Sequence, residues 1–134
     1  MSRAGGEVDL SGRWHGFFNY PRNRSPNQFE AELRDSAGRI AGTTTETSDH
    51  PASAGKLLQA WIEGARDGDQ VHFTKRYDDL RRAHYTILYD GVLAPGGDEI
   101  EGTWSIPGVW SGTFLMVRGS GDEIAAERRE TARV

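Results

Sequence analysis

Apolar and polar residues alternate along most of the chain, and helical periodicity is scarce. Segments in which every second residue is apolar are typical of half-buried β-strands. The alternation predicts eight strands, at 12–20, 27–35, 39–47, 56–65, 70–78, 84–93, 99–106 and 110–118. We therefore expect an all-β protein.

Glycine-bearing turns separate several of these strands, at 35–38, 66–69 and 94–98. Such segments predict tight hairpins, because glycine readily adopts a positive φ. Short strands joined in this way form an antiparallel meander, and eight of them can close so that no edge is exposed. The predicted fold is an eight-stranded antiparallel up-and-down β-barrel.

The chain has 134 residues, which fits one domain with one core. We assign 12–118 to the barrel domain and 1–11 to an N-terminal tail. Residues 119–134 are charged and contain several alanines, and they predict either a C-terminal tail or a short surface helix.

The connections of an up-and-down barrel alternate between its two ends. The tight turns then share one end with the N-terminus, whereas three longer connections, 21–26, 48–55 and 79–83, share the other end. Long loops on a rigid scaffold commonly carry binding residues. A ligand site is therefore expected at the end with the longer loops.

If Trp14 points into the barrel, alternation decides which residues of each strand point inward, which we call the inward phase of the strand. For 56–65 the sequence does not decide between the two possible phases. The inward set combines aromatic residues with a few polar groups, which is the usual form of a small-molecule site. The candidate ligand-binding residues are Phe18, Tyr20, Phe29, Thr44, Glu46, Phe73, Lys75, Tyr77, Tyr85, Tyr89, Trp104 and Phe114.

Burying Glu46 or Lys75 alone would be costly, so we expect them to pair or to meet water near the loop-bearing end. A salt bridge without a ligand is the alternative interpretation. The loops at this end are mildly basic, which would favour a ligand with an acid group. Their charged residues are Arg22, Arg24, Lys56, Arg76, Arg81 and Arg82 against Asp49, Asp78 and Asp79.

Glycine occurs in the inward phase of several strands, for example at Gly16, Gly42 and Gly102. These positions either let the sheet bend into a barrel or leave space for a ligand. The sequence allows both interpretations.

The segment Gly12-Arg13-Trp14, together with Arg118 in the last strand, resembles the calycin signature of lipocalins, fatty-acid-binding proteins and avidins. In those families the arginine packs across the tryptophan at the closed end of the barrel. The resemblance implies that Trp14 and Arg118 form a structural floor. Segments 40–44 and 100–104 are similar to avidin strands, which implies that Trp104 faces the ligand.

The first strand, which runs to Tyr20-Pro21, also has a weaker resemblance to the haem-binding nitrobindins. Those proteins ligate haem through a late histidine, and this chain has no histidine after His84. The residues with which avidins hold the biotin ureido oxygen cannot be placed either. The resemblance thus indicates the fold and leaves the ligand unidentified.

The formal net charge of -4 and the pI of about 5.5 argue against a nucleic-acid-binding protein. The sequence contains no cysteine, no signal-peptide pattern and no long apolar run. We expect a cytoplasmic protein without membrane contact.

The sequence has no phosphate-binding loop, dinucleotide fingerprint or nucleophile elbow. The histidines, His15, His50, His72 and His84, lack metal-ligand spacing, and three of them fall on the expected outer face. We therefore expect no metal, cofactor or catalytic residue.

The function expected is non-enzymatic binding of a small, largely apolar ligand, with or without an acid group, in the barrel lumen. The first alternative is a barrel enzyme that uses Glu46 with Tyr85 or Tyr89 for acid–base chemistry. The second is a protein-interaction module with a filled lumen. A contiguous outward patch of His15, Phe17, Trp61 and Leu88 would indicate a homodimer.

Overall fold

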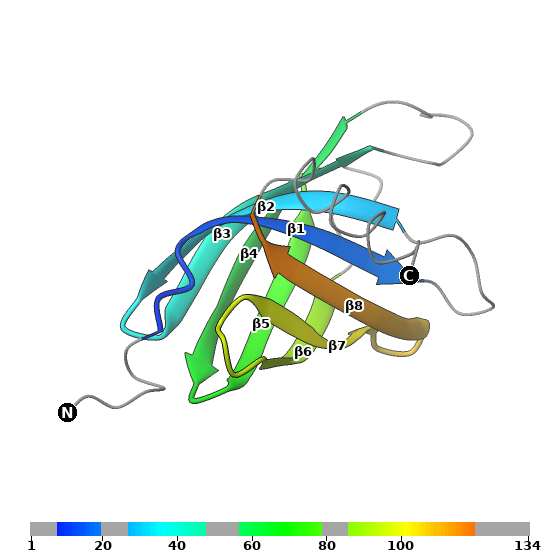
Figure 1. Ribbon diagram of the computed structural model, residues 1–134. Coiled ribbons are helices and arrows are strands. Elements are labelled where there is room, and N and C mark those ends of the chain that lie inside the picture. Colours follow the sequence, from blue (N-terminus) through cyan, green and yellow to red (C-terminus); the bar gives the residue numbers. More distant parts are fainter. Residues whose placement is uncertain (1–7, 20–26, 48–56, 79–85, 120–134) are drawn as a thin grey trace, which may run out of the picture.

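The computed structural model describes residues 8–19, 27–47, 57–78 and 86–119. Each strand is antiparallel to the next, and the last strand pairs with the first, so the sheet closes into a barrel (Figure 1). This confirms the predicted all-β fold and is compatible with a calycin-like barrel. The strands are β1 (Gly12–Asn19), β2 (Asn27–Ser36), β3 (Arg39–Thr47), β4 (Leu57–Asp67), β5 (Gln70–Tyr77), β6 (Ile87–Leu93), β7 (Glu99–Ile106) and β8 (Trp110–Arg118).

The observed strand limits lie close to those expected from the alternation. The largest difference among the described residues is at β4, which continues to Asp67 because its hairpin with β5 extends to the pair Asp67 and Gln70. Tyr20, Tyr85 and residues 120–134 lie outside the described residues, so the expected C-terminal tail or helix is among the parts not described.

The tight turns gather at one end of the barrel, which we call the closed end. Ala37 and Gly38 form a two-residue hairpin loop in which both φ angles are positive, at 56° and 91°. The amide of Arg66 donates a hydrogen bond to the Gly38 carbonyl (2.7 Å), and the amide of Leu93 donates to the Asp69 carbonyl (2.7 Å). These bonds join the turns of neighbouring hairpins.

The barrel interior, or lumen, is lined by the side chains that the alternation placed inside. The structure also decides the inward phase of β4, which the sequence left open. Leu58, Ala60 and Ile62 are buried, whereas Leu57 and Trp61 are exposed. Trp110 shares the inward phase of β8 but is 46% exposed, since it lies where β7 and β8 meet their connecting turn.

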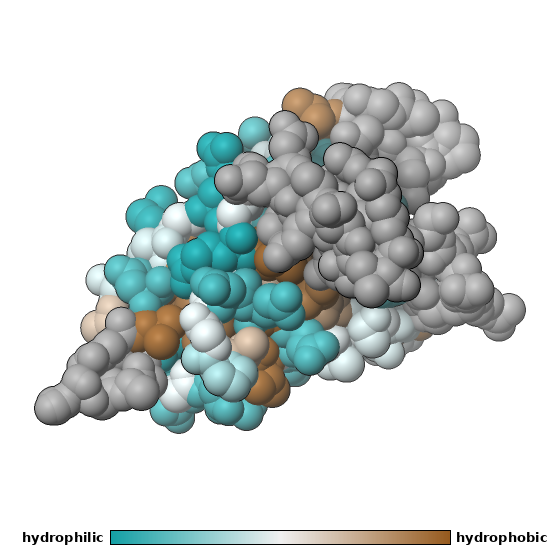
Figure 2. Space-filling view, in the orientation of Figure 1, coloured by the Kyte–Doolittle hydropathy of each residue, from teal (hydrophilic) through white to brown (hydrophobic). Residues whose placement is uncertain are grey.

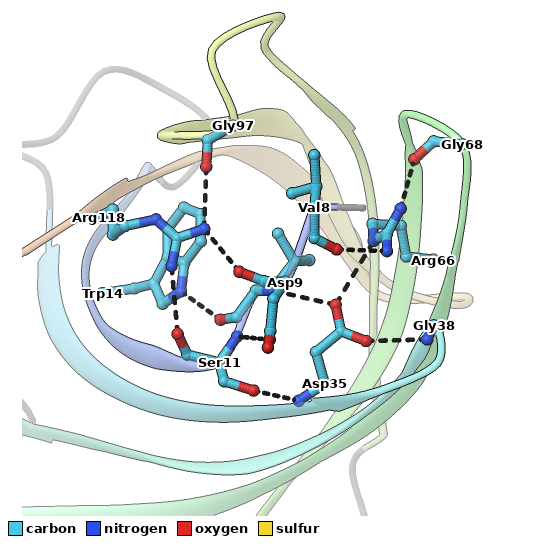
Figure 3. Close-up of polar contacts among 11 residues, drawn as sticks. Val8, Asp9, Ser11, Trp14, Asp35, Gly38, Arg66, Gly68, Gly97 and Arg118 are labelled. Atoms are coloured by element: carbon cyan, nitrogen blue, oxygen red, sulfur yellow. Dashed lines mark hydrogen bonds and ion pairs between the residues drawn. The ribbon is translucent and has the colours of Figure 1, made fainter. Parts of the chain in front are cut away.

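Trp14 and Arg118 are adjacent across β1 and β8 at the closed end (Figure 3). The Arg118 guanidinium carbon lies 4.5 Å from the Trp14 ring centroid, and Trp14 is fully buried. The same guanidinium donates hydrogen bonds to the carbonyls of Asp9, Ser11 and Gly97. One side chain therefore joins β8, the segment before β1 and the β6–β7 turn.

Residues 8–11 precede β1 and pack across the closed end (Figure 3). Leu10 is fully buried, its amide donates to Asp35 Oδ2 (2.9 Å), and its carbonyl accepts from Trp14 Nε1 (2.9 Å). Arg66 Nη2 donates to the Val8 carbonyl (2.6 Å). Because Asp35 and Arg66 belong to β2 and β4, this segment is held by side chains from two neighbouring hairpins.

The inward glycines are sites of close strand approach. A Cβ atom at Gly42 would lie 2.1 Å from the Glu32 carbonyl oxygen, and one at Gly102 would lie 1.9 Å from the Asp90 carbonyl oxygen. At Gly16, the missing side chain is replaced by the Phe29 ring. Backbone and aromatic atoms fill this space, which favours the structural interpretation of these glycines over a ligand-accommodating one.

We predict that Gly102→Ala lowers the free energy of unfolding by about 1–3 kcal/mol, because the new methyl group must push neighbouring backbone aside. Gly96→Ala is the control, since nothing lies within 4 Å of a Cβ atom there. Chemical denaturation would measure both variants. Equal midpoints for the two variants would contradict the close approach of β6 and β7.

Candidate ligand-binding site

The half of the lumen next to the closed end is filled by tightly buried apolar side chains. These are Trp14, Leu33, Ile40, Val71, Ile100 and Met116. Together with residues 8–11 they leave the opposite end as the place where a ligand would reach the lumen. We call that opposite end the loop end.

A buried ion pair lies in the half of the lumen nearer the loop end. Lys75 on β5 is 1% exposed and Glu46 on β3 is 8% exposed. Lys75 Nζ donates a hydrogen bond to Glu46 Oε1 (2.9 Å), and the Tyr77 hydroxyl donates to the same oxygen (2.9 Å). The two charges expected from the sequence thus meet inside the barrel.

Four aromatic rings surround the Lys75 ammonium. Nζ lies 4.8 Å from the ring centroid of Phe29, 4.9 Å from that of Tyr77, 5.2 Å from that of Phe18 and 5.8 Å from that of Tyr89. Cation–π attraction in a desolvated site reaches about 2 kcal/mol or more per contact. The rings and Glu46 therefore offset part of the cost of burying this charge.

The surroundings shift the pKa values of this cluster. Desolvation alone would lower the pKa of Lys75, but the oxygens of Tyr89, Tyr77 and Glu46 outweigh it, so its pKa lies well above the ordinary value. Burial raises the pKa of both Tyr77 and Tyr89 above the ordinary value. At neutral pH the site therefore holds a charged ammonium and two protonated phenols.

A wall of aromatic residues continues from this cluster toward the loop end. The Phe18 and Trp104 rings meet edge to face at 6.4 Å, and Trp104 and Trp110 do so at 6.1 Å. Trp104 Nε1 donates to the Asn19 carbonyl (3.0 Å), which leaves the indole as an apolar surface. Deeper in the lumen, Phe73, Tyr89 and Phe114 pack against one another.

The structure thus brings together the candidate residues that it describes. Tyr20 and Tyr85, and most of the charged residues expected on the loops, lie outside the described residues. Sequence reasoning did not include Trp110 and Ile87 among the candidates. Their inward phase was the available signal, but only the packing shows that they lie at the level of Trp104 and Lys75, respectively.

One expectation about the outer face needs correction. His15 was expected on a water-exposed face, but it is 7% exposed and its ring nitrogens contact Glu30 Oε2 and Gln28 Oε1. His72 on the outer face of β5 contacts Asp90 Oδ1 at 2.5 Å. Within the described part of the chain, no group of three or more potential metal-ligating side chains occurs.

A groove of about 570 Å³ lies beside the closed end, far from the polar cluster. It is lined by Val8, Gly68, Asp69, Val92, Leu93, Ala94, Pro95, Glu99 and Glu101. The carboxylates of this groove are exposed, so it lacks the buried polar groups that fix a ligand's orientation. The lumen is therefore the better candidate site.

No known protein-family description matches this sequence, and no curated protein matches it either. Among the described residues, no helix has the length and apolar character needed to cross a membrane. The function is therefore argued from the lumen and its chemistry.

We predict that Lys75→Met or Glu46→Leu alone lowers the free energy of unfolding by about 3–5 kcal/mol, because each leaves an unpaired buried group. The double variant should recover most of this loss, since no uncompensated charge stays inside. Urea denaturation of the two single variants and the double variant would measure the coupling.

Arg13 and Glu32 provide the control, because their ion pair has nearly the same N–O distance, 3.0 Å, but both side chains are more than half exposed. Substituting either one should cost about 1 kcal/mol or less. Additive losses at Glu46 and Lys75 would contradict a coupled buried pair.

We also predict that stability falls as the pH rises above about 10, the ordinary pKa range of tyrosine and lysine. The pKa values of Lys75, Tyr77 and Tyr89 are raised in the folded protein. The unfolded chain therefore releases these protons first, and each group lowers the free energy of unfolding by about 1.4 kcal/mol per pH unit. Denaturation series from neutral to alkaline pH would measure the decline, and Tyr89→Phe should make it shallower.

Proposed function

We propose that this protein binds a small, largely apolar ligand in the loop-end half of its lumen without acting as an enzyme. The observation that carries the proposal is the buried cluster of Lys75, Glu46 and Tyr77 beside an aromatic wall. A mostly apolar site with a few convergent polar groups is the usual form of a small-molecule site. The proposal includes a calycin-like relationship, as the pairing of Trp14 with Arg118 suggests.

Stability alone gives little reason for the polar cluster. Replacing a buried ion pair with well-packed apolar residues is often neutral or stabilising. In the closed-end half, the buried pair of Arg66 and Asp35 also binds backbone groups of residues 8–11 and 38, whereas among the described residues no such structural partner accounts for Lys75 and Glu46. Charged groups and perturbed pKa values inside the barrel therefore support recognition of a ligand.

The protonation states favour binding over acid–base catalysis. The raised pKa values of Tyr77 and Tyr89 keep both phenols protonated at neutral pH. An efficient general acid or base has a pKa near the working pH. The Tyr77 phenol therefore acts as a hydrogen-bond donor, and its O–H is already directed to Glu46.

A set of spectrally silent octyl compounds tests the proposal: octanamide, N,N-dimethyloctanamide and octanoate. Trp110 is partly exposed next to Trp104, so a bound chain should displace water and shift tryptophan emission to shorter wavelength. Binding at 100 times Kd should add about 2.7 kcal/mol of stability. Titration by emission and by calorimetry would measure both effects.

Trp110→Phe should abolish most of the emission shift. Trp61→Phe is the matched control, because Trp61 is 61% exposed on the outer face of β4. If none of the three compounds shifts emission or melting temperature, the binding proposal fails. If the shift disappears in the Trp61 variant instead, the compounds bind outside the barrel.

Exposed apolar side chains favour a second candidate, a protein-interaction surface. Leu57 and Trp61 on β4 are 65% and 61% exposed. The described surface seen in Figure 2 is mostly hydrophilic, with separate hydrophobic areas. Light scattering over a range of protein concentrations tests a homodimer, and Trp61→Arg should shift any dimer toward monomer.

A further inference from the structure

We propose that the ligand carries a neutral hydrogen-bond donor, such as an amide N–H, and that Glu46 and Thr44 on β3 receive it. This inference deepens the proposed binding function and rests on it. It concerns two oxygen atoms of the lumen, Thr44 Oγ1 and Glu46 Oε2, to which the described residues give no hydrogen-bond partner.

Thr44 provides the first observation. Its side chain is 1% exposed and faces the lumen, yet its Oγ1 atom has no hydrogen-bond partner among the described residues. Leaving a buried hydroxyl unpaired is costly, and native proteins rarely do so. Its register neighbours on β2 and β4 are the small residues Ala31 and Ala60, so no large side chain from either position covers it.

Glu46 provides the second observation. Lys75 and Tyr77 both donate to Oε1, and the described residues place no donor on Oε2. Glu46 and Thr44 are two positions apart on β3, and both are buried on the lumen side. Side chains so spaced on one face of a strand lie about 7 Å apart. Both side chains therefore face the same stretch of the lumen along β3.

The charge balance selects a neutral donor. Glu46 already neutralises Lys75, so a second carboxylate at this place would repel Glu46. A ligand cation would in turn lie close to the Lys75 ammonium. An N–H or O–H group on an apolar body meets neither penalty and supplies the missing donor to Oε2.

The three octyl compounds separate these head groups, since they share one chain. Octanamide carries N–H donors, N,N-dimethyloctanamide keeps only the acceptor, and octanoate carries the acid. We expect octanamide to bind about ten-fold more tightly than either of the others, because it alone donates a hydrogen bond to the charged Glu46 carboxylate. Calorimetry would measure the three dissociation constants.

Thr44→Val should weaken octanamide binding about five-fold and leave N,N-dimethyloctanamide binding unchanged, because only the hydroxyl is lost. Thr44→Ser should restore the affinity. Thr43→Val is the matched control, since Thr43 is exposed on the outer side of the same strand. The melting temperature of unliganded Thr44→Val should equal or exceed that of the parent protein, because the orphaned hydroxyl is removed.

Tightest binding of octanoate, or an unchanged octanamide affinity in Thr44→Val, would overturn this inference while leaving the binding function intact. A lower melting temperature of unliganded Thr44→Val would also overturn it, because the hydroxyl would then have a structural partner. If none of the compounds binds, the proposed function fails together with the inference.

Discussion

Pairing of β1 with β8 closes the sheet, and the properties of the interior depend on this closure. The register joins Trp14 with Arg118, Gly16 with Met116 and Phe18 with Phe114. An eight-stranded barrel encloses a space that side chains can fill or that holds one small ligand. Closure therefore sets both the number of inward positions and the room that they share.

The two halves of this space are built differently. Residues 8–11, Trp14 and the guanidinium groups of Arg66 and Arg118 seal the closed end with hydrogen bonds to backbone carbonyls. Arginine suits this role because its planar fork carries several donors. The sealed half gives the barrel a rigid base, and the pair of Lys75 and Glu46 lies toward the other end.

The Lys75 and Glu46 pair is a buried ion pair in the half of the lumen nearer the loop end. Its charges are satisfied by each other, by Tyr77 and by the surrounding rings, yet Thr44 Oγ1 stays without a partner in the described part of the lumen. A fully satisfied network rigidifies a core, whereas an incomplete one is costly. A ligand that completes the hydrogen bonds of β3 would remove this cost, which links the fold to the proposed recognition.

The sequence by itself determined the strands, the hairpin turns and the inward phase, because alternation and glycine are local signals. It also indicated that Glu46 and Lys75 face the lumen, and the resemblance paired Trp14 with Arg118. Only the tertiary structure decided which residues of β4 face inward, that His15 is buried and that Leu10 is buried at the closed end. It alone also revealed that, among the described residues, no donor or acceptor meets Thr44 Oγ1 and no donor meets Glu46 Oε2. Hydrogen-bond satisfaction depends on which strands become neighbours, and closure brings together residues that are far apart in the sequence.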